Sequence, residues 1–389
     1  MTLNGRDIVC VGCADWDTEI RTNQHHLMSR LGRDHRVLFV ESLGLRQPQL
    51  AARDLRRALN RLVRGIAPPR LADDGVYVLS PLVLPFHRYR LVRAVNRRLL
   101  PRLIRRAARR LGIAAPVLWA YNPQAEALID TLRPSSVIYH CVDDIAAQKG
   151  VDAESFRQAE RRYAASADVI FATSEPLAAR MRELSDRVVA MPNVADTPLF
   201  ASALDHGPVD AAMAALPRPR IVFIGAVVAT KLDLGLLVSL ARARPEWSFA
   251  LVGPVGAGDP GTDVAALEAE PNIHLLGARR HDKLPEVLRG ADAGIIPYAL
   301  NDLTASIFPL KVYEYLAAGL PVVTTPLPSL AGVDGVVTAA DADSAAARLD
   351  ELLAEDNPER RRERSRLASG HSWDERLDEM VTAIEQASA

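Results

Sequence analysis

Short runs of apolar, often β-branched residues alternate along the chain with segments in which apolar residues recur three and four positions apart. The runs predict buried strands and the segments predict amphipathic helices, such as those expected at 23–31 and 154–165. Continuous apolar strands joined by helical crossovers are typical of parallel sheets covered on both faces. In the first half we expect strands at residues 7–13, 36–40, 76–79, 117–120, 136–139, 169–172 and 188–190. In the second half we expect strands at residues 220–224, 248–252, 273–276, 293–296, 321–324 and 335–337. Because the pattern runs twice, the sequence predicts an α/β protein with two doubly wound, Rossmann-like domains.

A boundary between the domains is predicted at residues 193–220, where periodicity is weak and proline is frequent. We expect the first domain to span residues 1–197 and the second to span residues 198–371. After residue 335 the chain is predicted to end in helices, among them 344–353 and 373–384. Sheets of this type bind ligands at the carboxyl ends of their strands, so we expect binding sites there.

The charge of the chain is balanced overall but divided unevenly along its length. Its 389 residues carry 47 basic and 48 acidic side chains, and this balance predicts no polyanionic partner. The first 200 residues hold 30 of the basic and 21 of the acidic side chains, so the two halves differ in sign. Three cysteines are too few for a disulfide framework, which indicates a reducing compartment. With neither a leader-like start nor an apolar run of about 18 residues, we expect a cytoplasmic protein.

The most informative stretch is residues 301–323, NDLTASIFPLKVYEYLAAGLPVV. It follows a predicted strand and enters a helix near Phe308 and Pro309, because proline is favoured in a first helical turn. Free N–H groups at such a helix start suit a diphosphate, and Lys311 adds a positive charge. Glu314, three residues on and on the same face, can accept two hydroxyl protons from a ribose. The alternative is a surface Lys–Glu pair beside a buried helix.

This stretch resembles the donor-site motif of GT-B glycosyltransferases, in particular glycosyltransferase family 4 and its relatives. In that family two acidic residues, separated by seven others, precede A-x-G-x-P-V-V. The second acidic position falls on Glu314, which the resemblance makes the ribose ligand. The first falls on Ser306, a departure at the position that normally contacts the transferred sugar.

The resemblance covers nearly the whole chain. Residues 221–231, IVFIGAVVATK, resemble the family's diphosphate segment, with Gly225 and Lys231 matching and Ala226 in place of an arginine. Residues 249–253 and 272–277 resemble the strands that frame the nucleotide base. The resemblance implies a GT-B fold in which the last helix, residues 372–389, crosses back to the first domain. The donor-binding residues that we expect are Gly225, Lys231, Gly253, Arg279, Ser306, Ile307, Phe308, Pro309, Lys311 and Glu314.

A second group of polar residues is expected at the strand ends of the first domain. Residues 137–144, VIYHCVDD, form a predicted buried strand that ends in polar groups. A carboxylate or imidazole there can take the acceptor's hydroxyl proton, and we expect Asp143 first and His140 second in this catalytic role. The alternative makes Asp143 or Asp144 the N-cap of the following helix.

The acceptor side is expected near the amino terminus of the chain. Trp16 can stack on a sugar and Arg21 can bind an anion, although burial of the tryptophan in the protein is the alternative. Trp16, Arg21 and Gln24 form a W-x(4)-R-x-x-Q pattern that resembles enzymes of bacterial surface polysaccharide synthesis, such as teichuronic acid glycosyltransferases. Tyr121 and Asn122 follow another strand, at a position where relatives often carry a histidine that faces the sugar.

A basic amphipathic segment runs from Phe86 to Leu111. It holds ten arginines, and no acidic residue occurs between Leu82 and Ala125. An apolar stripe accompanies the arginines, as in helices that lie on anionic membrane surfaces. The alternative is a helix packed on the core with an arginine-rich outer face. Binding to nucleic acid is not expected, since no stacking aromatic residues interleave the charges.

The sequence therefore predicts a glycosyltransferase that moves a sugar from a nucleotide diphosphate sugar, expected to be UDP-linked, to a lipid-linked or surface-glycan acceptor. We expect retaining transfer without a metal or cofactor, because lysines stabilise the leaving nucleotide, and a location on the inner face of the cell membrane. One alternative is a glycosyltransferase with a soluble small-molecule acceptor. Another is a nucleotide-sugar epimerase or a non-catalytic GT-B subunit, which Ser306 and Ala226 keep open.

Overall fold

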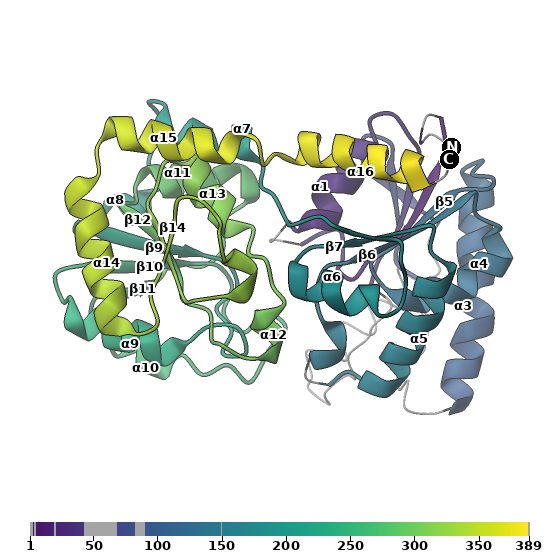
Figure 1. The fold of residues 1–389 in the computed structure, drawn as a ribbon, viewed down its shortest axis with the longest axis horizontal. Helices are drawn as coiled ribbons and strands as arrows, with labels where there is room; N and C mark the ends of the chain where they lie inside the picture. Colours follow the sequence, from purple (N-terminus) through teal and green to yellow (C-terminus); the bar gives the residue numbers. More distant parts are fainter. Residues whose placement is uncertain are drawn as a thin grey trace. The chain divides into compact units, whose positions relative to one another are not determined.

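The computed structural model describes residues 3, 5–18, 21–42, 68–81, 90–148 and 150–387. They form two compact units (Figure 1). Unit 1 comprises Met1–Pro192 and Leu377–Ala389, and unit 2 comprises Asn193–Arg376. The chain thus enters unit 2 after Pro192 and leaves it at Leu377, whereas the sequence analysis placed these boundaries after residues 197 and 371.

Unit 1 is built on an eight-stranded sheet with the order β3-β4-β2-β1-β5-β6-β7-β8. Neighbouring strands are parallel except β3 and β4, which pair antiparallel. The four-residue strand β1 is wholly buried, as are β2, β5, β6 and β7. This burial explains why all of them except β6, which includes Ser136 and His140, are unbroken apolar runs. The strands are β1 (Ile8–Val11), β2 (Val37–Val40), β3 (Arg70–Asp73), β4 (Val76–Leu79), β5 (Val117–Ala120), β6 (Ser136–Cys141), β7 (Val169–Ala172) and β8 (Val188–Ala190).

Helices cover both faces of this sheet (Figure 1). Apolar side chains of α3, α4, α5 and α6 form one core with every second residue of the strands, such as Val9 and Val11. Figure 1 shows α1 on the other face. The helices are α1 (Asn23–Leu31), α3 (Arg90–Arg110), α4 (Glu126–Leu132), α5 (Ala153–Ser166), α6 (Glu175–Arg182) and, from Leu377 on, α16 (Trp373–Ala387), with 3-10 turns η1 (Pro123–Ala125) and η2 (Ile145–Ala147).

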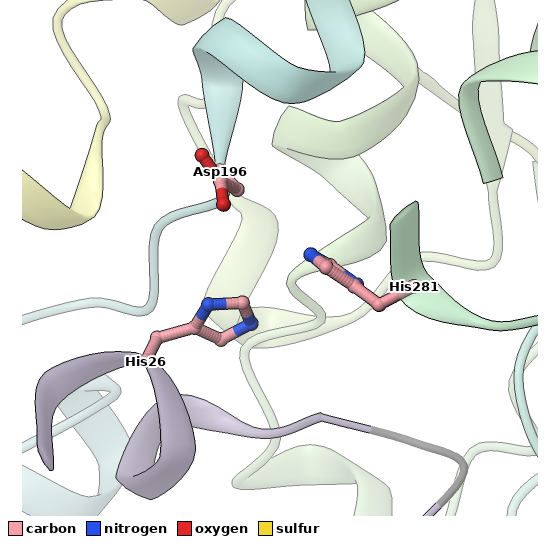
Figure 2. A group of neighbouring side chains, drawn as sticks. All are labelled: His26, Asp196 and His281. Atoms are coloured by element: carbon pink, nitrogen blue, oxygen red, sulfur yellow. The ribbon is translucent and has the colours of Figure 1, made fainter. Parts of the chain in front are cut away.

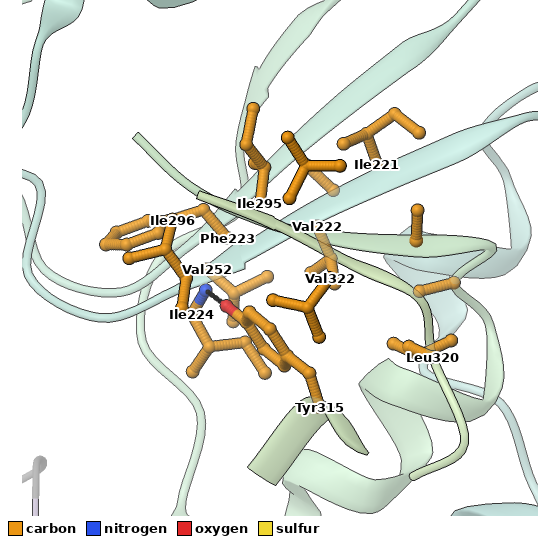
Figure 3. Packing of buried hydrophobic residues seen from close by; sticks show 14 of the residues in the cluster. Ile221, Val222, Phe223, Ile224, Val252, Ile295, Ile296, Tyr315, Leu320 and Val322 are labelled. Atoms are coloured by element: carbon orange, nitrogen blue, oxygen red, sulfur yellow. Dashed lines mark hydrogen bonds between the residues drawn. The ribbon is translucent and has the colours of Figure 1, made fainter. Parts of the chain in front are cut away.

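Unit 2 is built on a six-stranded parallel sheet with the order β11-β10-β9-β12-β13-β14. Its apolar residues form one continuous core (Figure 3). Helices α9, α10 and α14 lie along one face, and α7, α11, α13 and α15 lie along the other (Figure 1). The strands are β9 (Arg220–Ile224), β10 (Ser248–Val252), β11 (Ile273–Leu275), β12 (Ala293–Ile296), β13 (Val322–Thr324) and β14 (Val336–Thr338).

The helical elements of unit 2 range from single turns to fourteen residues. They are α7 (Thr197–Ala201), η3 (Ser202–Leu204), α8 (Ala211–Ala214), α9 (Leu234–Ala243), α10 (Ala265–Glu268), η4 (His281–Lys283), α11 (Leu284–Arg289), α12 (Asp302–Ala305), α13 (Lys311–Ala317), η5 (Pro328–Leu330), α14 (Ala342–Glu355) and α15 (Pro358–Ser369). Asp341 caps α14 by accepting from the Ser344 amide. Within the described ranges, no helix is long and apolar enough to span a membrane.

The prediction of an α/β protein with two doubly wound domains is confirmed. The helix expected to start near Phe308 and Pro309 is α13, which begins at Lys311 and follows the single turn α12. The edge strand β3 has no counterpart in the sequence analysis, since half of its residues are exposed and it carries no apolar run.

Candidate active site

The strand order of unit 2 reverses between β9 and β12, which pair side by side although they are distant in sequence. In doubly wound sheets the carboxyl ends of the strands at such a point form the ligand site. Gly225 directly follows β9, and Tyr298 lies two residues beyond the end of β12. The unit 2 site is therefore expected around these two residues.

Two glycines permit close packing at this edge of the sheet. Gly225 has a φ of +143°, and a Cβ atom added there would lie 2.6 Å from Lys311 Cε and 2.9 Å from Lys311 Nζ. A Cβ atom on Gly253, the residue after β10, would lie 2.0 Å from the carbonyl oxygen of Gly225. The side chain of Lys311 therefore lies directly against the Gly225 backbone, in space that no other residue type would leave open.

The ammonium group of Lys311 is held by aromatic rings instead of a carboxylate. Its Nζ atom lies 5.4 Å from the ring centre of Phe223, 5.8 Å from that of Tyr298, and 3.4 Å from the Tyr298 hydroxyl. Cation–π contacts of this kind hold a charge without neutralising it. No carboxylate in the described part of the chain forms an ion pair with Lys311, so its charge is available to an anion.

The loop that precedes α13 has its carbonyl groups occupied. The side chains of Ile307 and Phe308 are buried. Ser329 Oγ donates to the carbonyl oxygen of Ile307 at 2.5 Å, and Asn193 Nδ2 donates to that of Phe308 at 3.0 Å. Among the residues that the structure describes, the backbone N–H groups of Phe308 and Lys311 donate to no protein group. The loop therefore combines occupied acceptors with free donors beside the lysine.

Glu314 lies near the start of α13, three residues after Lys311. Burial raises the pKa of its carboxyl group from 4.5 to about 7. The positive charge of Lys311 opposes that shift in pKa, and the negative charge of Asp196 adds to it. Near neutral pH the carboxyl group can thus carry or release a proton, and it can hydrogen-bond to hydroxyl groups in either form.

The neighbouring Tyr315 fixes α13 to the sheet. Its hydroxyl oxygen accepts a hydrogen bond from the Ile224 amide at 2.7 Å, at the end of β9 (Figure 3). Its ring packs over Gly294 in β12, where an added Cβ atom would lie 2.3 Å from the ring. Helix α13 is therefore held in register with β9 and β12, which places Lys311 over Gly225.

The remaining expected donor residues lie in different surroundings. Arg279 forms an ion pair with Asp210 at 2.7 Å and also donates to the carbonyl oxygens of Leu276 and Ala278, so it fastens a loop of the unit. Ser306 is the C-cap residue of α12 and is partly buried. Lys231 is partly buried, and its side chain forms no ion pair within the described residues.

Unit 1 has a corresponding reversal between β1 and β5. His140 lies inside β6 instead of after it, is 2% exposed, and stacks on the ring of Tyr121 with 4.8 Å between ring centres. Tyr121 and Asn122 follow β5 and are also buried, and Asn122 accepts from the Gln124 amide. Cys13 Sγ donates to the Tyr121 carbonyl oxygen at 3.2 Å. These residues form a buried layer beneath the carboxyl ends of the strands.

The two adjacent aspartates after β6 differ in their partners. Asp144 is the N-cap residue of η2, yet its side chain makes no capping bond. Instead, both of its carboxylate oxygens accept from Arg157 at 2.7 Å. Asp143 is partly buried and lies near the Cys13 thiol. The pKa of that thiol is raised mainly by burial and, to a smaller extent, by the negative charge of Asp143. The carboxylate of Asp144 is thus occupied by Arg157, whereas that of Asp143 lies near the Cys13 thiol.

The segment after β1 is held from within unit 1. Trp16 is 7% exposed and packs edge-on against Phe39, and its amide donates to Glu41. Gln24 is buried, and its side-chain oxygen accepts from the Cys13 amide. Arg21 is exposed. Burial of the tryptophan in the protein, which the sequence analysis left as an alternative, is therefore what the structure contains.

Three residues of ligand type are shown in Figure 2. Asp196 and His281 belong to unit 2, where a carboxylate oxygen and a ring nitrogen lie within 4.8 Å of each other. His26 belongs to unit 1. Neither unit by itself supplies the three ligands, and the absence of a metal requirement stays a prediction.

The described part of the basic segment forms helix α3, while residues 86–89 lie outside the described residues. Ile104, Ala107 and Ala108 face the core of unit 1. On the outer face Leu99 and Leu103 are 48% and 38% exposed. Five arginines line a shallow hollow of about 370 Å³ on this helix, namely Arg102, Arg105, Arg106, Arg109 and Arg110.

Two doubly wound units, each with a strand reversal in its sheet, are typical of the GT-B class of fold. Residues 218–355 match the family described as glycosyl transferases group 1. The chain is 30% identical over 224 residues to TuaH of Bacillus subtilis (strain 168), a protein named as a teichuronic acid biosynthesis glycosyltransferase. That match covers 54% of this chain, and the chain spans only about half (56%) of the length of this relative.

Solved structures share the fold over the whole chain. Sucrose-phosphate synthase from Thermosynechococcus elongatus is 15% identical, with a TM-score of 0.70 over 99% of this chain and 100% of its own. HepE from Anabaena, solved in complex with UDP, is 15% identical, with a TM-score of 0.67 over 98% of this chain and 100% of its own. The GT-B fold and the resemblance to surface-polysaccharide glycosyltransferases that the sequence indicated are thus confirmed.

The sequence analysis did not find every residue at the unit 2 site. Asn193 was expected only as part of a linker. Ser329 and Tyr298, whose ring contacts the ammonium group of Lys311, were given no role. Asn193 and Ser329 act on backbone carbonyl groups more than 20 residues away, and no local pattern reveals such contacts.

Proposed function

We propose that this chain is a glycosyltransferase that takes a sugar from a nucleotide diphosphate sugar, with UDP as the nucleotide. The observation that carries the proposal is the ammonium group of Lys311, unpaired among the described residues and held against Gly225 at the strand reversal of unit 2. The group 1 family match over residues 218–355 and the UDP complex of the structural relative HepE support it.

In this proposal the diphosphate lies beside Lys311 and Lys231 and accepts hydrogen bonds from the free backbone N–H groups of Phe308 and Lys311. Glu314 binds the ribose hydroxyl groups. The two lysines stabilise the negative charge that develops on the leaving nucleotide, so transfer requires no metal. The transfer is retaining, and Ser306 replaces the acidic residue that relatives place near the sugar.

Calorimetric titration tests the donor site. Wild type is titrated with UDP, GDP and ADP, alongside Glu314→Ala and the control Glu351→Ala, which removes an exposed glutamate from α14 of the same unit. We expect UDP to bind the wild type and the control, and to bind Glu314→Ala at least tenfold more weakly. Absence of binding by any of the three nucleotides would contradict the proposal, and selective binding of GDP or ADP would replace the base.

Catalysis is proposed to use Asp143, with His140 as the second choice. The separate pairing of Asp144 with Arg157 supports the choice of Asp143 over its neighbour. In a transfer assay with an identified acceptor, Asp143→Asn is expected to lower kcat while leaving UDP binding unchanged. Asp144→Asn is the matched control. Its expected effect is mainly a lower melting temperature, with little change in kcat. Equal turnover by Asp143→Asn and wild type would remove Asp143 from the mechanism.

We propose a lipid-linked or surface-glycan acceptor, reached through contact of α3 with an anionic membrane. The exposed leucines and the five clustered arginines of α3 support this, because partial insertion of apolar side chains and attraction to anionic lipids act together. In a sedimentation assay the protein is expected to bind phosphatidylglycerol vesicles at low salt and to bind phosphatidylcholine vesicles far less.

The Leu99→Ser, Leu103→Ser double variant is expected to bind these vesicles several-fold more weakly. Leu367→Ser, which removes a comparably exposed leucine from unit 2, is the matched control. Equal vesicle binding by all three proteins would contradict a role for α3. A wild type that does not bind vesicles would favour a soluble small-molecule acceptor, and conversion of UDP-sugars without any acceptor would favour an epimerase.

A further inference from the structure

Two side chains outside the expected motif hold the loop at residues 307–309. Ser329, in the turn η5 after β13, donates to the carbonyl oxygen of Ile307 at 2.5 Å. Asn193, the first residue of unit 2, donates to the carbonyl oxygen of Phe308 at 3.0 Å. The two donors come from segments 136 positions apart in sequence (329 minus 193), and they act on consecutive peptide groups.

The bond from Ser329 fixes the direction of an N–H group. In a trans peptide the C=O of one residue and the N–H of the next point in opposite directions. Because the Ile307 carbonyl group is directed at Ser329, the N–H of Phe308 is directed the other way. That N–H has no protein acceptor among the described residues, so it can donate a hydrogen bond to a bound anion.

The bond from Asn193 acts on a peptide group that has an acceptor but no donor. The residue after Phe308 is Pro309, which has no N–H group. This peptide therefore presents only the partial negative charge of its carbonyl oxygen, which would repel a phosphate nearby. Asn193, which is 7% exposed, donates a hydrogen bond from its side-chain amide to that oxygen. The partial positive charge of the donated hydrogen atom therefore lies next to the oxygen.

We propose that Asn193 and Ser329 are positioning residues for the binding of a nucleotide diphosphate. Their hydrogen bonds turn the carbonyl groups of the loop away from the diphosphate and turn the N–H group of Phe308 toward it. This inference rests on the proposed donor site and assigns a role to two residues outside the motif that defines that site. Neither residue needs to touch the ligand.

The chain offers a matched control for the loss of such a bond. Asn272 lies in the same unit and its side-chain nitrogen donates to three carbonyl oxygens, those of Ala241, Arg244 and Trp247, at 3.0 to 3.1 Å. Its replacement removes more hydrogen bonds than replacement of Asn193. It does so before the amino end of β11, whereas the nucleotide site is expected at the carboxyl ends of these parallel strands. A general loss of stability would therefore be at least as large in Asn272→Ala.

The test is the UDP dissociation constant, measured by calorimetry, together with the melting temperature of each variant. Asn193→Ala and Ser329→Ala are each expected to weaken UDP binding by about five- to tenfold, as expected for one lost net hydrogen bond. Asn272→Ala is expected to lower the melting temperature and leave the dissociation constant within twofold of wild type. Ser329→Thr, which keeps the hydroxyl group, is expected to restore binding.

Wild-type affinity in both Asn193→Ala and Ser329→Ala would overturn the inference while leaving the donor site intact. Equal weakening of UDP binding in Asn272→Ala would also overturn it, because the effect would then be one of general stability. A wild type that binds no nucleotide diphosphate would instead refute the proposed function and this inference with it. If Asn193→Ala does not fold, Ser329→Ala and Ser329→Thr decide the question.

Discussion

The raised pKa of Glu314 makes the stability of the protein depend on pH in a direction that can be measured. In the unfolded chain a glutamate titrates near 4.5, whereas burial moves the pKa of Glu314 in the folded chain to about 7. The folded state therefore holds this proton more tightly than the unfolded state. The contribution of Glu314 to the free energy of unfolding is highest below pH 4.5 and is lost as the pH rises through 7.

The size of the effect follows from the same two values. A pKa difference of one unit corresponds to about 1.4 kcal/mol, so the change from 4.5 to about 7 gives an upper limit of about 3 kcal/mol. The side chain is only partly buried, and solvent screening reduces that figure. We expect about 1–3 kcal/mol of stability to be lost by the wild type between pH 4.5 and pH 8.

The perturbation is Glu314→Gln, which keeps the shape of the side chain and removes its titration. At pH 8 the variant is expected to be more stable than the wild type by about 1–3 kcal/mol, and at pH 4.5 the two should agree. Urea unfolding at both pH values measures the difference, with Glu351→Gln as a control for the loss of an exposed carboxylate. The reasoning is refuted if wild type and Glu314→Gln show the same change in stability between the two pH values.

Two further substitutions test the packing that places Lys311. Gly225→Ala should move the lysine, since the new Cβ would lie 2.6 Å from its Cε, and we expect UDP binding to weaken by tenfold or more. Gly332→Ala is its control, because Gly332 also has a positive φ but open space around it. It should cost only about 1–2 kcal/mol of backbone strain and leave UDP binding unchanged. Tyr315→Phe leaves the buried Ile224 amide without its acceptor and should lower the free energy of unfolding by about 1–3 kcal/mol, measured in urea. Wild-type stability in that variant would contradict the role assigned to the hydroxyl group.

The fold was predictable because burial on both faces leaves a direct trace in the sequence. Strands such as β5 and β7 are fully buried, and their residues are accordingly an unbroken apolar run. Strand β3 pairs at the edge of the sheet with its first two residues exposed, so nothing in its sequence distinguishes it from a loop. Prediction from sequence thus failed at β3, whereas the other edge strands, β8, β11 and β14, were expected from their apolar runs.

The site was predictable only in part. Lys311 and Glu314 were expected together because three residues of helix separate them, which is a local relation. Arg279 was expected among the donor-binding residues, and its pairing with Asp210, a partner 69 positions earlier in the chain, was not expected. The contact of Asn193 with the loop is likewise non-local. A side chain's partner across such distances is decided by tertiary packing, which a single sequence does not display.

The two units differ in how the chain composes them, and this sets an order for biosynthesis. Unit 2 is one uninterrupted stretch, whereas unit 1 also requires the segment that begins at Leu377. Met380 and Ile384 in that segment are almost fully buried. A ribosome thus delivers every residue of unit 2 before it delivers the last helix that unit 1 needs. The first part of the chain to be made is therefore expected to complete its native burial last, and a nascent chain that stops after Arg376 would expose apolar surface of unit 1 to chaperones and proteases.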